Sequence, residues 1–203
     1  MRMLAIDCAT QACSLALFEG EELLERRHEI LGRGHAEQLV PLIASLPDKG
    51  RADEIRVSLG PGSFTGVRIG LAAARALGLA WSAAVRGYPT LALVAATARA
   101  QVPGPVSVCM AGGHGEWFVQ DFSADGLPQD EARSVAPEAS IGRWNHAVIA
   151  GDRAVDKAAR EGAGHRALDL LPDARHVLAL PACLLTDDLT PIYGRGPDAR
   201  VPS

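Results

Sequence analysis

Short apolar runs alternate with charged or periodic segments along the first part of the chain. MLAIDCA, ACSLALF and the charge-rich EELLERRHEI follow one another with brief interruptions, which predicts three consecutive strands in a meander. The next segment, HAEQLVPLIASL, has apolar residues at i, i+3, i+4 and i+7, the spacing of one helix face: Leu39, Leu42, Ile43 and Leu46. Pro41 is tolerable in this helix only in the first turn or two.

The alternation continues to Ala100. EIRVSL predicts another strand, and the motif GPGSFTGVRIG, residues 60–70, leads from it into a helix that runs to about Trp81. AVRGY predicts a short strand, and PTLALVAATARA predicts a helix that ends near Ala100. Strands that alternate with helices indicate an α/β fold.

A second strand cluster follows the break at QVPGPVSV, where two prolines and a glycine interrupt the pattern. VSVCMA, EWFVQDF, a weaker segment near QDEARSV, and HAVIAG are the expected strands. Both halves place strands first and a helix later, although no residue-level repeat is visible. We therefore expect two related lobes, residues 1–100 and a smaller, degenerate 101–189, with the Pro- and Gly-rich residues 190–203 as an extended tail.

The motif GPGSFTGVRIG has two interpretations. A glycine-rich junction between a strand and a helix frees backbone N–H groups that can bind an anion. The motif nevertheless departs from the P-loop and from the dinucleotide fingerprint, because its third glycine comes late and no lysine follows. Arg68 is the only nearby cation in the sequence. The alternative is a tight turn with Ser63 as the helix N-cap, which the usual capping preferences favour.

The predicted helix after this motif has small residues at every fourth position: Gly66, Gly70, Ala74 and Gly78. Each interior glycine lowers the stability of a helix by about 0.5–1 kcal/mol relative to alanine. We therefore expect that close packing of another helix or strand against these residues compensates for the loss. Val40 and Ala44 add apolar surface to the preceding helix. The two helices are therefore either a partner interface or a helix pair inside the lobe. The interface interpretation predicts that Gly70→Leu or Ala74→Arg impairs partner binding while the monomer stays folded.

Composition narrows the classes of function. The chain has 203 residues, of which 48% are hydrophobic, and its 20 basic and 24 acidic residues give a formal net charge of -4. This mixed charge provides no broad cationic field and argues against unaided binding to nucleic acid. Cys8, Cys13, Cys109 and Cys183 lack C-x-x-C spacing and indicate a reducing compartment. Without a signal-peptide pattern or a long apolar span, we expect a cytoplasmic protein that does not enter membranes.

Few residues are candidates for catalysis. Asp7 ends the first expected strand, a position where many α/β folds hold a metal-linked carboxylate, but no second carboxylate has a comparable position. The histidines form neither H-x-x-x-H nor H-E-x-x-H, and Ser63 is outside the G-x-S-x-G pattern. The sequence around AGGHGE predicts a hairpin turn with His114 exposed at its tip. We therefore expect no catalytic residue and no metal site.

Four segments together resemble the TsaB (YeaZ) family: MLAIDCATQACSLAL, HAEQLVPLI, GPGSFTGVRIGLAAARALGLA and PIYGRGPDA. They cover most of residues 3–100 and about the last ten residues. The resemblance implies an actin-like, sugar-kinase-like (ASKHA) architecture of two RNase-H-like lobes. It also implies a non-catalytic subunit that supports formation of N6-threonylcarbamoyladenosine in tRNA, paired with the catalytic paralogue TsaD and the ATPase TsaE. Contact with tRNA would be indirect, through the complex.

The resemblance also assigns candidate sites. It places an interface with TsaD, or with a second copy in the absence of TsaD, on the two helices of the first lobe: His35, Leu39, Leu42, Ile43, Phe64, Gly66, Val67, Gly70, Leu71, Ala74 and Gly78. The chain is expected to have no cofactor of its own, although a nucleotide (ATP or ADP) at the partner interface stays open. The candidate contacts for such a nucleotide or another anion are Asp7, Thr10, Gly60, Gly62, Ser63 and Arg68.

The second lobe departs from the family pattern. The family usually has an acidic-Ala-Arg triplet followed by G-E-V-Y, whereas this chain has AGGHGEWF, so the role of the hairpin Ala111–Glu116 is open. Residues 125–188 match nothing specific. Two enzymatic alternatives to the scaffold also stay open. One is an ATP-dependent phosphotransferase or acyl transferase that uses Asp7 and the turn Gly60–Gly66, and the other is a peptidase, for which the sequence shows no metal pair or activated nucleophile.

Overall fold

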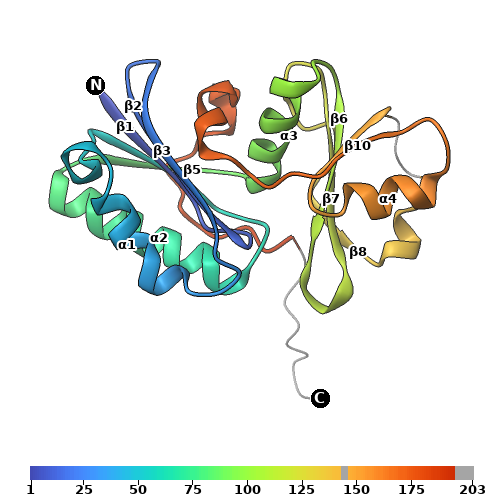
Figure 1. The fold of residues 1–203 in the computed structure, drawn as a ribbon, viewed down its shortest axis with the longest axis horizontal. Helices are drawn as coiled ribbons and strands as arrows, with labels where there is room; N and C mark the ends of the chain where they lie inside the picture. The colour runs from blue at the N-terminus through green and yellow to red at the C-terminus, as the bar shows by residue number, and fades with distance from the viewer. Residues whose placement is uncertain (143–145, 195–203) are drawn as a thin grey trace.

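The computed structural model describes residues 1–142 and 146–194, and its strands form two five-stranded sheets (Figure 1). The strands are β1 Arg2–Asp7, β2 Ala12–Glu19, β3 Glu22–Ile30, β4 Glu54–Ser58, β5 Ala84–Tyr88, β6 Val106–Ala111, β7 Trp117–Phe122, β8 Arg133–Val135, β9 Val148–Ala150 and β10 Arg166–Leu168. The α-helices are α1 His35–Ala44, α2 Phe64–Trp81, α3 Thr90–Gln101 and α4 Ala154–Glu161. Short 3-10 helices are η1 Pro47–Gly50, η2 Gly113–Gly115, η3 Pro137–Ser140, η4 Ala174–Ala179 and η5 Ala182–Leu184.

The first sheet has the order β3-β2-β1-β4-β5, with the predicted meander at one edge. β1 pairs antiparallel with β2, which pairs antiparallel with β3, whereas β4 lies parallel to both β1 and β5. Alternate residues of β1 enter different cores: Leu4 and Ile6 face α1 and α2, and Met3 and Ala5 face α3. Both faces of β1 are covered, which explains why its sequence is continuously apolar.

The second sheet repeats this topology in the order β10-β9-β6-β7-β8. β6 pairs antiparallel with β7 and parallel with β9, as β1 does with β2 and β4. The repeat confirms the prediction of an α/β protein with two related, actin-like and sugar-kinase-like lobes. The expected strands of the second half are all present. β10 was not predicted, because its three residues, RAL, are too few to show a period.

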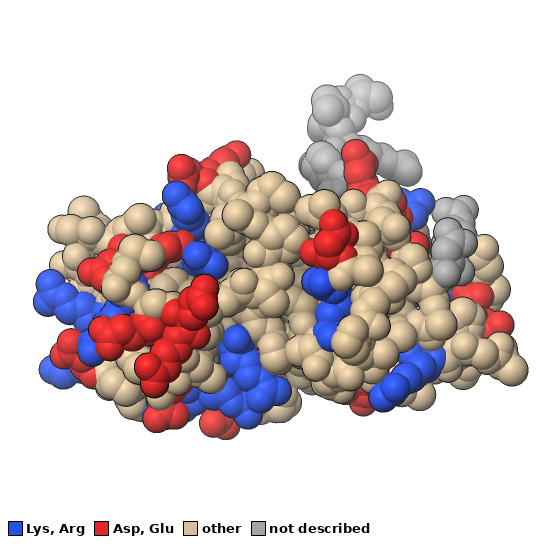
Figure 2. Space-filling view, turned by 90° about the horizontal axis from the view of Figure 1, so that it is seen from above, with Lys and Arg blue, Asp and Glu red and all other residues tan. Residues whose placement is uncertain are grey.

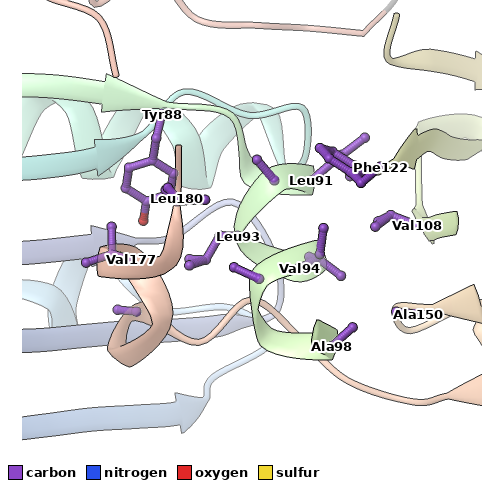
Figure 3. Close-up of a cluster of buried hydrophobic side chains, with 14 of the residues drawn as sticks. Tyr88, Leu91, Leu93, Val94, Ala98, Val108, Phe122, Ala150, Val177 and Leu180 are labelled. Atoms are coloured by element: carbon purple, nitrogen blue, oxygen red, sulfur yellow. The ribbon is translucent and has the colours of Figure 1, made fainter. Parts of the chain in front are cut away.

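Helix α3 lies between the two sheets (Figure 1). Residues 90–98 are all buried, so this helix is apolar on every side and has no solvent-facing stripe. In Figure 3, Leu91 lies beside Phe122 of β7, and Leu93 points toward Val177 of η4. η4 packs back on β1, β2 and β3, so the chain returns to the first sheet after the second. The division at residue 100 stays a prediction, since α3 packs against both lobes.

The small-residue stripe of α2 faces the protein's own sheet, so its prediction as a partner surface is wrong. Gly66, Gly70, Ala74 and Gly78 are all buried. A Cβ added at Gly66 would overlap the carbonyl oxygen of Cys8, and one added at Gly78 would overlap the side chain of Val85. The glycines allow α2 to approach β1 and β5 closely, and this internal packing offsets their cost in the helix. Gly70→Leu and Ala74→Arg would therefore disturb the lobe itself.

Most of the other predicted interface residues are also internal. Leu39, Ile43, Val67 and Leu71 belong to the core between α1, α2 and the sheet. His35 is buried, and its Nε2 lies 3.2 Å from the carbonyl oxygen of Ala12. The resemblance placed the interface on the two helices that carry these side chains, and in the structure the apolar face that their spacing marks is the core. Of the eleven predicted residues, Phe64 is exposed and Leu42 is half-buried.

Candidate functional site

The exposed sides of α1 and α2 carry apolar residues on the outside of the first lobe, beside the exposed charged side chains of Glu37, Arg68 and Arg75. On α2 the exposed row lies two positions from the buried glycines, or about 200° around the helix axis. Phe64 is the large apolar residue of this row. Leu79, whose exposure is 86%, lies next to the row, one position after Gly78, and on α1 Val40 is exposed to 58%. We call this surface the helical face and define it by eight exposed residues: Ala36, Val40, Ala44, Phe64, Ala72, Ala76, Leu79 and Ala80. Alanines between large apolar residues allow another helix to approach closely.

The arginines near the helical face are held by the C-terminal segment. The guanidinium of Arg68 lies 3.5 Å from the centroid of the Phe64 ring, and its Nη2 donates to the hydroxyl oxygen of Tyr193 at 3.0 Å. Arg75 Nη2 donates to the carbonyl oxygen of Leu189 at 3.1 Å. Cation–π and hydrogen-bond contacts therefore fix these side chains. The predicted tail is an ordered strap along α2 up to residue 194, and residues 195–203 lie outside the described residues.

A cleft of about 770 Å³ lies between the two lobes. The first lobe contributes the turn Ala9–Gln11 and the loop Gly62–Phe64. A hydrogen bond joins the two segments, because the Ser63 N–H donates to the carbonyl oxygen of Ala9 at 2.6 Å. Glycine is required at position 62, because a Cβ there would overlap that carbonyl group. The loop then enters α2, because the Ser63 hydroxyl accepts from the Gly66 N–H at 3.1 Å. The predicted N-cap is confirmed.

The predicted anion contacts separate into two groups. Thr10, Gly62 and Ser63 line the cleft. Gly60 does not line it, because the carbonyl oxygen of Ile192 covers the position, and Arg68 is turned to Phe64 and Tyr193. Asp7 has no exposed surface. The prediction that Asp7 contacts a ligand is therefore wrong, because a side chain without surface cannot touch one.

Asp7 is a buried carboxyl group beneath the cleft. Its Oδ1 accepts from the Ala9 N–H at 3.0 Å, whereas its Oδ2 has no hydrogen-bond partner among the described residues. Burial raises the pKa of Asp7 from 3.8 to about 7, since the Ala9 N–H and the nearby Ser58 and Tyr88 hydroxyls offset only part of the desolvation. Asp7 helps to shape the turn at residues 9–12, and at neutral pH a large fraction of it is protonated.

This environment predicts pH-dependent stability. A carboxyl group whose pKa is raised by folding stabilises the folded state fully below its unfolded pKa, and this contribution is lost as the pH rises through about 7. The free energy of unfolding of Asp7→Asn relative to the parent chain should therefore rise by roughly 3 kcal/mol between pH 5 and pH 8. Denaturant unfolding of both proteins at the two pH values measures this change. A constant difference between them would show that Asp7 is ionised throughout.

The second lobe supplies the other wall of the cleft, for which local sequence patterns carry little signal. Gly112, Gly113 and His114 of the predicted hairpin line the cleft opposite Ser63, together with Asp152 and Arg153 at the start of α4. Asp152 Oδ1 accepts from the Ala111 N–H at 2.7 Å, and burial raises the pKa of Asp152. The loop position of Asp152 and the exposed His114 were visible in the sequence. Their proximity to Thr10 and Ser63 depends on contacts between the lobes, which no local pattern records.

Two further features concern metals and membranes. In residues 1–142 and 146–194, no group of three or more His, Cys, Asp or Glu side chains is placed to hold a metal ion. No helix of this part of the chain has the length and apolar character that a membrane span requires. Basic and acidic residues are interspersed on the face shown in Figure 2, in agreement with the mixed charge of the sequence.

Comparison with known proteins identifies the family. Residues 28–176 match the family model described as "TsaD: tRNA N6-adenosine threonylcarbamoyltransferase". The chain belongs to this family.

Two curated TsaB proteins, named "tRNA threonylcarbamoyladenosine biosynthesis protein TsaB", are similar to it. The one from Escherichia coli is 37% identical over 100 residues, or 47% of this chain and 43% of its own length. The one from Haemophilus influenzae is 36% identical over 107 residues, or 50% of this chain and 42% of its own length.

Solved structures extend the similarity beyond these matched regions, which span less than half the length of the two curated relatives. YeaZ from Pseudomonas aeruginosa superposes with a TM-score of 0.80 at 27% identity and covers 95% of this chain and 99% of its own. A protein described as similar to peptidase YeaZ from the same species superposes with a TM-score of 0.81 at 25% identity, covering 96% and 99%. These matches confirm the resemblance to the TsaB (YeaZ) family and the two-lobe fold.

Proposed function

We propose that this protein is a non-catalytic subunit in the formation of N6-threonylcarbamoyladenosine in tRNA and that it supports a catalytic TsaD-type partner. The names of the curated relatives support the pathway. The main structural support for a subunit role is the helical face, where Val40, Phe64 and Leu79 are exposed beside a row of alanines. Apolar surface of this kind is costly to leave in water and is typical of a protein interface.

The occupant that we propose for the helical face is the TsaD-type paralogue. The same small-residue surface can also pair with a second copy when the paralogue is absent, and the ATPase TsaE joins the assembled pair. Contact with tRNA then takes place through the complex. The charge of this chain supports that division of roles, because a net charge of -4 gives no attraction for the phosphate backbone.

Reconstitution tests the proposed function. Purified TsaD and TsaE from the same organism are supplied with substrate tRNA, ATP and threonylcarbamoyl donor, with and without this chain, and modified adenosine is measured by mass spectrometry after digestion of the tRNA. We expect modification only when the chain is present and a complex by size-exclusion chromatography. Full modification without the chain would overturn the proposal, as would failure to assemble with TsaD.

The interlobe cleft supports a second candidate, a nucleotide-dependent phosphotransferase or acyl transferase. Thr10 and Ser63 face His114 and Arg153 across a volume that suits a small molecule. Under this alternative the isolated chain must bind ATP. Calorimetric titration of the isolated protein with ATP and ADP, repeated in the presence of TsaD, separates the two candidates. Binding that needs the partner favours a nucleotide at the partner interface, and binding to the isolated chain favours the enzyme.

A further inference from the structure

Two free thiols face each other where β1 ends and β2 begins. Cys8 and Cys13 are both buried, and their Sγ atoms lie 3.9 Å apart. They belong to the core between the first sheet and α2. The subunit role proposed above uses neither thiol. Any oxidation of this thiol pair would therefore be independent of the partner.

The strand register places the two residues at a position suited to a cross-strand disulfide. β1 and β2 pair Asp7 with Ser14, so the next step brings Cys8 opposite Cys13. The Gly20 N–H donates to the carbonyl oxygen of Met1, which marks Met1 and Gly20 as a hydrogen-bonded pair at the far end of the same ladder. Because the two pair types alternate along an antiparallel ladder, Cys8 and Cys13 occupy a non-hydrogen-bonded pair, whose Cα atoms lie about 4.5 Å apart. That separation is within the roughly 4.4–6.8 Å that a disulfide spans.

We propose that Cys8 and Cys13 form an intramolecular disulfide when the folded protein meets hydrogen peroxide. The Cys13 thiolate attacks one peroxide oxygen, the O–O bond breaks, and hydroxide leaves, so that Cys13 becomes a sulfenic acid. The Cys8 sulfur then attacks the Cys13 sulfur, the S–O bond breaks, and water leaves as the S–S bond forms. The two thiols lose two electrons and two protons in total, and the peroxide is reduced to two water molecules.

The local contacts assign these roles to the two sulfurs. The thiol–thiol hydrogen bond lowers the pKa of Cys13 and raises the pKa of Cys8, which burial and the charge of Asp7 raise further. Cys13 is therefore the thiol that ionises first, and Cys8 is the resolving partner. The turn that covers the pair, Ala9–Gln11, lines the interlobe cleft. Because both thiols are buried, the reaction requires this turn to admit a small peroxide.

The bond would form at the base of α2. The carbonyl oxygen of Cys8 packs against Gly66, and the Cβ of Cys8 lies 3.6 Å from the point where a Cβ at Gly70 would be. A change in the position of the Cys8 side chain therefore alters the packing of the first two turns of α2, the helix that carries most of the helical face. This thiol pair is a modification site within the first lobe, distinct from the proposed partner surface.

Thiol mapping by mass spectrometry tests the proposal. The full chain carrying Cys183→Ser, which removes the exposed thiol, is treated with hydrogen peroxide while folded, then denatured, alkylated and digested with trypsin. Cys8 and Cys13 fall on one tryptic peptide, residues 3–26. We expect this peptide to lose two hydrogens and both alkylation sites and to recover both after reduction, while Cys109 is alkylated in full.

Two outcomes would overturn the proposal. In the first, the peptide keeps two alkylated thiols at peroxide concentrations that oxidise Cys183 in the parent chain. In the second, Cys13 accumulates as sulfinic acid while Cys8 stays a free thiol. A Cys8→Ser variant adds an independent test, because loss of the resolving thiol should leave a Cys13 sulfenic acid that dimedone traps. Absence of that adduct in a folded variant would contradict the assigned roles.

Discussion

Replacement of Gly66 by alanine is expected to lower the free energy of unfolding by about 3 kcal/mol. The new Cβ would overlap the carbonyl oxygen of Cys8, a buried backbone atom directly after β1 that cannot rotate away. The Gly66 N–H also donates to the Ser63 hydroxyl, so a shift of the helix to relieve the overlap would weaken the N-cap. Chemical denaturation followed by circular dichroism measures the change.

Gly70 provides the matched control on the same helix. A Cβ at Gly70 would lie 3.6 Å from the Cβ of Cys8 and from the Cγ2 of Val57, which is ordinary van der Waals contact. Gly70→Ala should therefore raise the stability by about 0.5–1 kcal/mol through the better helix propensity of alanine. If both alanine variants stabilise the protein, α2 does not pack on β1 as closely as described.

A charged residue in the centre of the helical face should abolish tight binding to the partner without unfolding the chain. Ala72 is exposed on α2, with Ala76 one turn away, and Ala72→Arg would place a long, solvated side chain where another helix must approach. We expect at least tenfold weaker affinity for TsaD, about 1.4 kcal/mol or more. Exposed substitutions of this kind change stability by only about 0.5 kcal/mol, so the melting temperature should barely move.

Ala159→Arg is the control for this experiment, because Ala159 is an exposed alanine of α4 in the second lobe. The same substitution there should leave the affinity for TsaD unchanged. Calorimetric titration of TsaD with the parent chain and both variants gives the comparison. Equal weakening by both variants would point to a general effect of charge, and weakening by Ala159→Arg alone would move the interface to the second lobe.

The sequence predicted most elements of the fold because each carries a local signal. The apolar runs of β1 and β2, the alternating strands of the second half and the Ser63 cap are all local patterns, and each appears where it was expected. Even Pro41 is accommodated within α1. β10 was missed because three residues cannot show a period.

The face of α2 that packs on the sheet could not be predicted in the same way. This helix has two rows of small residues on opposite sides, one through Gly66 and Gly70 and the other through Ala72 and Ala76. Periodicity shows that both rows exist and does not show which one meets the sheet. The contacts at two positions decide it, because a Cβ at Gly66 would overlap the carbonyl oxygen of Cys8 and one at Gly78 would overlap the side chain of Val85, whereas alanine is acceptable in solvent or against a partner.

Only the first-lobe wall of the cleft includes residues that the sequence analysis proposed as anion contacts. Thr10, Gly62 and Ser63 lie in one lobe near an identifiable motif, and they do line the cleft. His114 and Arg153 reach the same cleft only because the second sheet repeats the topology of the first and α3 fixes the two lobes against each other. Such long-range placement leaves no trace in a short stretch of sequence.

Site-specific photo-crosslinking tests the central claim, that the helical face binds the catalytic partner. A photoreactive phenylalanine analogue is placed at Leu79 of α2 or, as the control, at Val155 of α4; both side chains are exposed, to 86% and 56%. Each protein is mixed with TsaD and irradiated, and crosslinked products are identified by mass spectrometry. We expect a crosslink to TsaD from position 79 and none from position 155. A crosslink from position 155 with none from position 79 would contradict it.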